Sequence, residues 1–339
     1  MERRLAVIIR RSNAGQPVAV VRIGGLARHP LKLPLMGWRM LSMARKWAMT
    51  EAQNALRVAS FAVVVLVLWG IPTARPADAT IILGEKAELG NGMVQTYADL
   101  DSDGTPNAIG VRFSKLMLEG LPTAATDMHH CFDVDDDGTV NSHTECVGGH
   151  ERILALPEAL AERANITFKW LLLNWNGFGH VPPGVYNAPH FDFHFYTMSL
   201  EARNAIRPGK CGIVMNCEDF KRATVPVPAR YFPAGYTDVG AAEVAMGNHL
   251  VDLNMPEFGE PSEFTHTFIY GTYDGDIIFY EPMITQAHFM SQVNSCTEIK
   301  LPAAWQTEGY YPTTYCIRYL KAEGAHTVSL EGFVRRKAE

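Results

Sequence analysis

One short stretch of this sequence combines residue types that could do chemistry. Residues 190–195 read HFDFHF, so that histidine, aspartate and histidine alternate with three phenylalanines. Side chains alternate across a β-strand, which places His190, Asp192 and His194 on one face and the aromatic rings on the other. Imidazole and carboxylate groups are ligands for Zn, Fe, Mn and Cu. The pattern predicts a transition-metal site; the alternative is a hydrogen-bonded polar pocket that holds no metal.

The spacing within this stretch limits which residues can share an ion. His190 and His194 lie roughly 13 Å apart at their Cα atoms on a regular strand, whereas Asp192 is about 7 Å from either. We therefore expect one histidine–aspartate pair to bind an ion with ligands from elsewhere, such as His180 or His249. The other histidine would be an outer partner or a proton carrier. The expected metal ligands are His190, His194, His249, His266 and Glu281, and the expected catalytic groups are His180 and Asp192.

His266 and Glu281 belong to a second candidate segment, residues 264–285. An Asp-Gly pair at 274–275 separates two β-rich runs and is a strong type I′ turn signal. A two-residue loop would place His266 and Glu281 on one aromatic face, which we expect to bind a cofactor or a small apolar molecule. A one-residue change of register would break this prediction; the alternative is a solvent-facing histidine and a structurally bonded glutamate. The expected lining residues are Phe268, Tyr270 and Phe279.

An Asp-rich loop indicates calcium as a secondary prediction. Asp133, Asp135 and Asp137 stand in the D-x-D-x-D-G opening of a calcium loop. The twelfth position should carry a glutamate but holds Thr144, with Glu145 one residue late. The sequence also predicts no flanking EF-hand helices, so a turn stabilised by its own aspartates is the alternative.

Strands must carry most of these residues, and strand signals dominate the chain after residue 79. β-branched and aromatic runs bounded by turn residues are typical of short strands. This pattern predicts a mainly β domain over residues 80–339, either barrel-like or a sandwich, with a few short helices. We expect an Asp- and His-rich loop to be inserted at about 121–153. The expected strands are 80–83, 93–97, 108–113, 166–173, 190–196, 264–270, 276–281, 314–320 and 327–334, and the expected helices are 114–119, 158–164, 199–206 and 285–293.

Charge divides the chain into two parts. Residues 1–79 carry 12 basic and 3 acidic residues, whereas the remainder carries 18 basic and 33 acidic residues. An acidic body of this size lacks the basic surface that nucleic-acid binding needs. We therefore expect a metal ion or a small molecule as the partner, and no nucleic acid.

The basic N-terminal part has the features of an export signal. Residues 58–71 form a 14-residue apolar run, and an A-x-A site follows at 77–79. A bilayer span needs roughly 20 apolar residues, so we favour a cleaved signal peptide over 51–79. The alternative is an uncleaved anchor, which would be the only contact with a membrane. Residues 1–50 are expected to be a disordered or mis-annotated extension.

All six cysteines lie after this segment. An even number of cysteines in an exported chain indicates disulfides, although free or metal-bound thiols are the alternative. We expect neighbours in sequence to pair, because each bond would then close one loop. The expected bonds are Cys131–Cys146, Cys211–Cys217 and Cys296–Cys316. These features predict a periplasmic or secreted protein.

Several sequence blocks resemble a family of exported bacterial proteins typified by a sigma-E-regulated protein of a thermophilic bacterium. The blocks are NWNGFGHVPPGVY (174–186), PHFDFHFY (189–196), MGNHLVD (246–252) and YGTYDGDIIFYEPMIT (270–285). The resemblance implies a β-rich domain and ring-like or cage-like homo-oligomers, but no particular reaction. The residues that it carries over are His180, His190, Asp192, His194, His249 and Glu281.

We expect, on these grounds, an exported protein that binds a transition metal. Metal-activated water or Lewis-acid chemistry would make it a metal-dependent hydrolase or oxidoreductase. One alternative is a non-enzymatic protein whose aromatic wall binds a small apolar ligand. Another is a stress-induced oligomeric envelope protein whose histidines only stabilise the fold.

Overall fold

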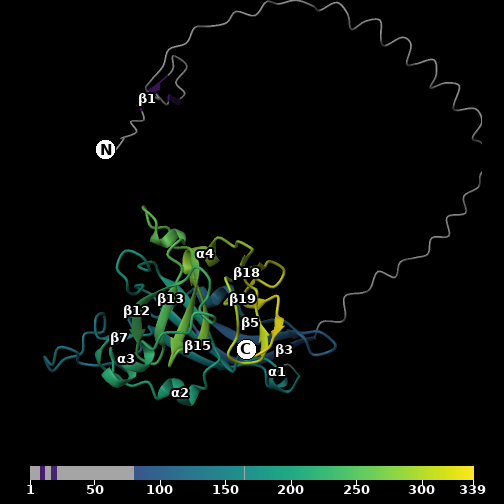
Figure 1. Cartoon of the computed structure of the whole chain (residues 1–339). Coiled ribbons are helices and arrows are strands. Elements are labelled where there is room, and N and C mark those ends of the chain that lie inside the picture. The colour runs from purple at the N-terminus through teal and green to yellow at the C-terminus, as the bar shows by residue number, and fades with distance from the viewer. Residues whose placement is uncertain (1–7, 12–16, 21–79, 164) are drawn as a thin grey trace, which may run out of the picture. The chain divides into compact units, whose positions relative to one another are not determined.

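The fold is mainly β, as predicted, with 45 % strand against 11 % helix in a computed structural model (Figure 1). The chain divides into two compact units, residues 1–71 and 72–339. The structure describes residues 8–11, 17–20, 80–163 and 165–339.

The first unit contains one described element, a two-stranded antiparallel pair. Strand β1 (Ile8–Arg11) pairs with β2 (Pro17–Val20). The rest of the expected extension at 1–50 and the expected signal peptide at 51–79 lie outside the described residues. Among the residues that the structure does describe, every helix is too short or too polar to cross a bilayer.

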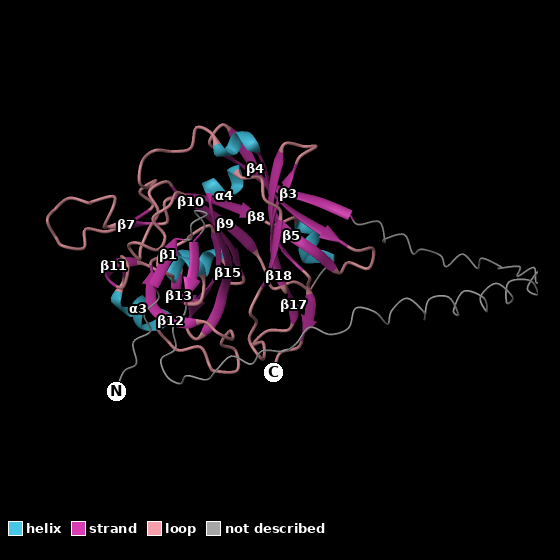
Figure 2. Cartoon of the chain, turned by 90° about the horizontal axis from the view of Figure 1, so that it is seen from above, coloured by secondary structure: helices cyan, strands magenta, loops and turns pink. Residues whose placement is uncertain are grey.

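The second unit is built on two antiparallel sheets that stack as a sandwich and do not close into a barrel (Figure 2). The seven-stranded sheet has the order β12 (Thr237–Glu243), β13 (Gly247–Val251), β14 (His266–Tyr273), β15 (Asp276–Thr285), β10 (His190–Tyr196), β9 (Trp170–Asn176), β8 (His150–Ala155). The six-stranded sheet has the order β16 (Ser295–Glu298), β18 (Thr314–Leu320), β19 (Ala325–Glu331), β5 (Pro106–Ser114), β4 (Gly92–Leu100), β3 (Thr80–Leu89).

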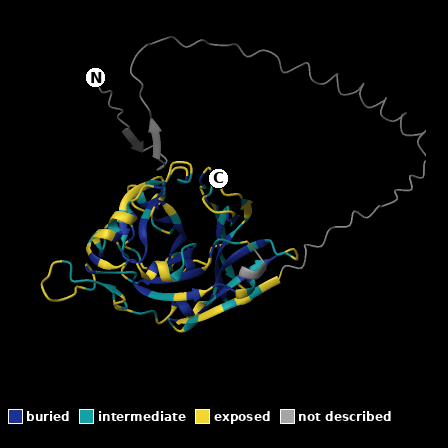
Figure 3. Ribbon diagram, turned by 60° about the horizontal axis from the view of Figure 1, so that its bottom comes forward, coloured by how far each residue is buried: buried dark blue, intermediate teal, exposed yellow. Residues whose placement is uncertain are grey.

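The aromatic face of β10 forms the centre of the sandwich. Phe191, Phe193 and Phe195 have no exposed surface, and they share one apolar cluster with Val111 and Phe113 of the opposite sheet. Full burial of each such side chain contributes roughly 1.5–3 kcal/mol. Figure 3 shows the buried strand interiors in dark blue and exposed residues mainly in loops and in one edge strand. The core therefore fixes β10 by one face and leaves its polar face pointing away from the other sheet.

Short elements complete the described part of this unit. The remaining strands are β6 (His130–Cys131) paired with β7 (Cys146–Val147), β17 (Gly309–Tyr311) paired with β20 (Val334–Arg336), and β11 (Pro208–Cys211). The helices are α1 (Glu158–Arg163), α2 (Leu200–Asn204), α3 (Cys217–Ala223), α4 (Gln286–Met290) and the 3₁₀ turns η1 (Lys115–Leu118) and η2 (Pro256–Phe258). The three predicted disulfides are confirmed: Cys131–Cys146, Cys211–Cys217 and Cys296–Cys316.

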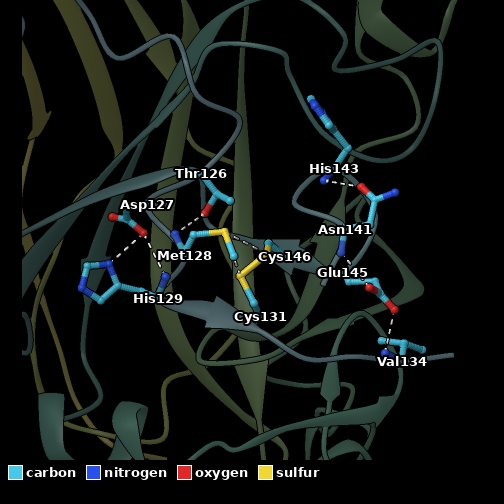
Figure 4. The surroundings of a disulfide bond; sticks show 10 residues. All are labelled: Thr126, Asp127, Met128, His129, Cys131, Val134, Asn141, His143, Glu145 and Cys146. Atoms are coloured by element: carbon cyan, nitrogen blue, oxygen red, sulfur yellow. Dashed lines mark hydrogen bonds and ion pairs between the residues drawn. A yellow bond between two sulfur atoms is a disulfide. The ribbon is translucent and has the colours of Figure 1, made fainter. Parts of the chain in front are cut away.

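The predicted insertion is a loop closed at its base by β6, β7 and the Cys131–Cys146 disulfide (Figure 4). Its shape depends on the carboxylate of Glu145, which accepts hydrogen bonds from the backbone N–H groups of Val134 at 2.7 Å and Asn141 at 2.8 Å. Backbone donors that would otherwise lack partners are satisfied in this way. The base of the loop is therefore held in one place beside the seven-stranded sheet.

Candidate metal centre

The polar face of β10 is buried against loops and not exposed to solvent. His190, Asp192 and His194 are 0 %, 4 % and 1 % exposed. The same outer face of the sheet carries a second apolar cluster, which includes Tyr196 and Phe279. The predicted alternation of β10 is confirmed, and its polar residues lie in a dry environment where charges need partners.

The predicted register of the β14–β15 hairpin is wrong beyond its turn. Tyr273 pairs with Asp276 as expected, but a β-bulge between Gly271 and Thr272 shifts every later pair by one residue. Glu281 consequently pairs with Ile269. A shift of one residue moves side chains to the other face of a sheet, so His266 and Glu281 do not share a face.

This shift removes three expected residues from the site. His266 points into the sandwich, where its Nδ1 lies 2.8 Å from the Tyr315 hydroxyl. Phe268 and Tyr270 belong to the same inter-sheet core and line no ligand cavity on the polar face. Phe279 does lie on the polar face, with its ring 4.8 Å from that of His194 and 5.5 Å from that of His249. Of the expected aromatic wall, only Phe279 contacts the polar residues.

A first group of three converging residues is formed by His180, His190 and Asp192, which we call the aspartate group. The Nε2 atom of His190 lies 3.2 Å from Asp192 Oδ1, and that of His180 lies 3.6 Å from Asp192 Oδ2. Both rings donate Nδ1–H to backbone carbonyls, His190 to Ala188 at 2.7 Å and His180 to Val181 at 2.8 Å. A backbone carbonyl on Nδ1 orients Nε2 toward the centre, which is the usual arrangement of metal-binding histidines.

Charge within the aspartate group is strongly coupled. Although burial alone would raise the pKa of Asp192, the neighbouring His190 and His180 hold that pKa well below its usual range. Burial opposes protonation of His180, but the Asp192 carboxylate outweighs it and raises the His180 pKa to about 9. In the metal-free protein this group therefore holds at least one proton, which a bound cation would replace.

A second group is formed by His194, His249 and Glu281, which we call the glutamate group. The strand register continues from Asp192–Met283 to Phe195–Tyr280, so His194 stands opposite Glu281. Their Nε2 and Oε1 atoms lie 3.2 Å apart. His249 comes from β13 and donates Nδ1–H to the carbonyl of Ala241 at 2.7 Å, which turns its Nε2 toward the group.

Gly271 allows this second group to assemble. A Cβ atom at Gly271 would lie 2.0 Å from the ring of Phe279. Only glycine leaves room for that ring, which contacts the rings of both His194 and His249.

Burial keeps the glutamate group neutral in the metal-free protein. It lowers the pKa of His194 to about 3 and that of His249 to about 4. Burial, followed by the charges of Asp192 and Glu243, raises the pKa of Glu281 well above its usual value. Both imidazoles are thus unprotonated at neutral pH, as metal binding requires.

The closest nitrogen–oxygen contacts in both groups lack hydrogen-bond geometry. His190 Nε2 and Asp192 Oδ1 have no hydrogen-bond partner although they are 3.2 Å apart, and His194 Nε2 likewise has none beside Glu281. Ligand atoms that bind one ion lie about 2.0–2.2 Å from the ion and therefore about 3.0–3.5 Å from each other. Their lone pairs point at the ion and not at one another. The geometry of each pair therefore resembles two ligands of a common ion.

The two groups line one cavity of about 520 Å³. His180 and Asp192 reach it from the aspartate group, and His249 and Glu281 from the glutamate group. The inserted loop forms part of the wall, and His143 of this loop packs against the exposed ring of Phe178. Apolar side chains complete the lining: Val239, Val251, Phe258, Ile269 and Met283. A cavity of this size and composition fits a small, largely apolar molecule.

Sequence reasoning missed two polar residues of the site. Asn176 donates from Nδ2 to Asp192 Oδ2 at 2.6 Å and leaves Oδ1 free. Glu243 lines the cavity from the end of β12, in a run without any motif. Asn174 and Asn176 are two residues apart on the strand that precedes the histidine motif. This spacing, which places both side chains on one face, was the only sequence signal for Asn176.

The Asp-rich loop brings together a different set from the expected one. Asp133 and Asp135 lie near Glu145, whereas Asp137 is not in this group and instead accepts from the hydroxyl of Thr139 at 2.7 Å. The Glu145 oxygens already accept backbone hydrogen bonds. Calcium binding by Asp133, Asp135 and Asp137 stays a prediction.

Comparisons with family models, curated proteins and solved structures find no match for this chain. The family resemblance, and the homo-oligomer that it implies, therefore stay predictions. The geometry of the two groups is the main evidence for function.

Proposed function

We propose that this protein is an exported metal-dependent enzyme that hydrolyses a small molecule in the cavity. The observation that carries the proposal is the arrangement of His190 and Asp192. Their Nε2 and Oδ1 atoms lie 3.2 Å apart, fully buried, without a hydrogen bond, and a backbone carbonyl orients the imidazole. The three disulfides are consistent with an oxidising compartment outside the cytoplasm.

The aspartate group supplies the ligands in this proposal. His190 and Asp192 form the buried side, and His180, whose side chain is 33 % exposed, forms the side that faces the cavity. Three protein ligands leave coordination positions open, which is typical of catalytic metal sites. A transition ion bound there would polarise a carbonyl or activate a water molecule.

Glu243 is the proposed general base. It lines the cavity together with His180 and Asp192 but belongs to neither ligand group. Burial raises the pKa of Glu243 to about 7 even though His180 opposes the shift. A carboxylate with a pKa near the working pH is suited to accept a proton from a nucleophilic water.

An oxidoreductase is the second candidate, and one observation favours it. Two histidines and one carboxylate with open positions are also the ligand set of non-haem iron oxygenases. The identity of the metal separates the candidates, because zinc supports hydrolysis and iron supports oxygen chemistry.

Metal content and metal-dependent hydrolysis test the proposal together. The full chain would be expressed with its own N-terminal segment and recovered from an oxidising compartment, and its metal would be measured by mass spectrometry. We expect at least one equivalent of zinc and hydrolysis of small apolar esters that a chelator abolishes. Asp192→Asn should lose the hydrolysis and one equivalent of zinc, whereas His129→Ala, an exposed histidine outside the cavity, should lose neither. A folded protein without metal after reconstitution would refute the proposal and leave a binding protein for an apolar ligand.

A further inference from the structure

We propose that the cavity is a two-ion centre, in which the glutamate group binds a second transition-metal ion. This inference rests on the proposed function, which needs only the aspartate group. It adds a separate site made by His194, His249 and Glu281, beside the first group and in the same cavity.

The strand geometry separates the two sites. Within each group the candidate ligand atoms lie within 4.8 Å of one another, and no residue belongs to both groups. Asp192 and His194 are successive residues on one face of β10, about 7 Å apart at their Cα atoms. His190 and His194 are twice as far apart and cannot serve one ion without bending the strand. The same alternation that builds one group therefore builds a second beside it.

Unpartnered buried atoms point to a ligand in the glutamate group. His194 is 1 % exposed, and neither of its ring nitrogens has a hydrogen-bond partner. The Oε2 atom of Glu281 is also buried without a partner. Each unsatisfied buried polar group destabilises the folded protein, and such groups call for a specific explanation. An ion between His194 Nε2, His249 and the Glu281 carboxylate would satisfy His194 Nε2, and it would also satisfy Glu281 Oε2 where the carboxylate binds through both oxygens.

The balance of charge favours two ions over one. Three carboxylates, those of Asp192, Glu243 and Glu281, line the cavity. Buried carboxylates are normally paired with cations or coordinate metal ions. One divalent ion held by the aspartate group would pair with Asp192 and leave the Glu281 carboxylate without a cation. A second ion in the glutamate group would supply that partner.

The shared cavity gives the second ion a role. His180 and Asp192 reach the cavity from one group, and His249 and Glu281 from the other. A substrate in the cavity would contact both sites at once. Paired ions in hydrolases stabilise both the attacking and the leaving oxygen.

Titration with cobalt(II) tests the number of sites. The full chain would be stripped with a chelator and titrated with Co²⁺ while its visible absorption is recorded. We expect saturation at two equivalents in the parent protein. His180→Ala and His249→Ala should each saturate at one equivalent, and the double variant should bind none. His143→Ala is the matched control, because His143 lines the cavity but belongs to neither group, and it should keep two equivalents.

The outcomes separate this inference from the proposed function. Saturation of the parent at one equivalent, with His249→Ala unchanged, would overturn the second site and keep the first. Saturation of the parent at one equivalent, with binding abolished by either His180→Ala or His249→Ala, would indicate a single site shared by both groups. This result would also overturn the second site. No binding in the parent would overturn both proposals. The parent titration needs no variant, so it decides the number even if a variant fails to fold.

Discussion

Two glutamates on the seven-stranded sheet, with side chains 7 % and 3 % exposed, differ in the completeness of their partners. Glu151 of β8 accepts from Arg203 at 2.6 Å and lies 3.2 Å from the Nε2 of His130. Arg203 in turn donates to the carbonyl of Ala245 at 2.8 Å. Glu281 of β15 has an unpartnered oxygen and faces an imidazole without a hydrogen bond.

The difference separates a structural cluster from a ligand site. A buried charge whose partners are all present is part of the fold and needs no ligand from solution. A buried polar group without partners destabilises the metal-free folded protein, and binding of a ligand to that group removes the penalty. The Glu151 cluster should therefore control stability, and the aspartate and glutamate groups should control metal binding.

The largest change in stability is expected from breaking the Glu151 cluster, which is formed by Glu151, Arg203 and His130. Arg203→Met leaves Glu151 buried beside one weak partner, and loss of one member of a buried ion pair costs about 3–5 kcal/mol. Denaturant unfolding should show this loss in the free energy of unfolding. Metal bound per folded molecule should stay unchanged. A loss below about 1 kcal/mol, or a parallel loss of metal, would contradict the division between the two regions.

The second largest effect is expected from acid, which should weaken the Glu151 cluster. Burial opposes ionisation of Glu151, but His130 and Arg203 outweigh it and lower its pKa to about 2. The unfolded chain has the ordinary value of 4.5, so this stabilisation is complete above about pH 4.5 and is lost as the pH falls toward 2. Between pH 7 and pH 2.5 the unfolding free energy of the parent should fall by about 2–3 kcal/mol more than that of Glu151→Gln. If the unfolding free energies of the parent and of Glu151→Gln change in parallel with pH, the pKa of Glu151 is not lowered by folding.

Asn176→Ala should affect metal binding and leave most of the stability intact. Asn176 donates to Asp192 at 2.6 Å and orients it. Loss of such an outer partner weakens metal binding typically 10–100-fold, or about 1.4–2.7 kcal/mol. Competition with a coloured chelator would measure the change. Asn254→Ala removes a similar bond, to Asp252 at 3.0 Å, outside the cavity and should leave metal affinity unchanged.

The smallest stability effect is expected at the centre of the glutamate group. Because burial keeps Glu281 neutral in the metal-free protein, Glu281→Gln should change the free energy of unfolding by less than about 1 kcal/mol. The same change should remove the second metal equivalent. A metal-free protein destabilised by several kcal/mol would place Glu281 with Glu151 as a structural residue.

The sequence predicted the parts of the fold that have local causes. Alternation in β10, the Asp-Gly turn at 274–275 and the neighbouring cysteine pairs all follow from short-range rules, and each is confirmed. The strands β8, β12 and β13 were missed because they lack β-branched or aromatic runs and form through pairing with their neighbours. Helix α3 was missed for a similar reason, since it is short and begins at a disulfide.

Long-range geometry explains the remaining errors in the site. The bulge lies at Gly271, where the ring of Phe279 occupies the space that a Cβ atom would need. A lone glycine in a strand is compatible with a bulge but does not fix one. The bulge places His266 and Glu281 on opposite faces of the sheet and makes Ile269 the cross-strand partner of Glu281. The division into two ligand groups depends on His180 and His249, which reach β10 from other segments. Motif spacing found these residues but could not assign them to one group or the other.

Anomalous X-ray diffraction would test the metal centre most directly. Crystals grown with saturating zinc would be measured on both sides of the zinc absorption edge. We expect an anomalous peak about 2.0–2.2 Å from His190 Nε2 and Asp192 Oδ1. A structure in which these atoms bind only water, or only each other, and in which the cavity shows no anomalous peak would contradict it.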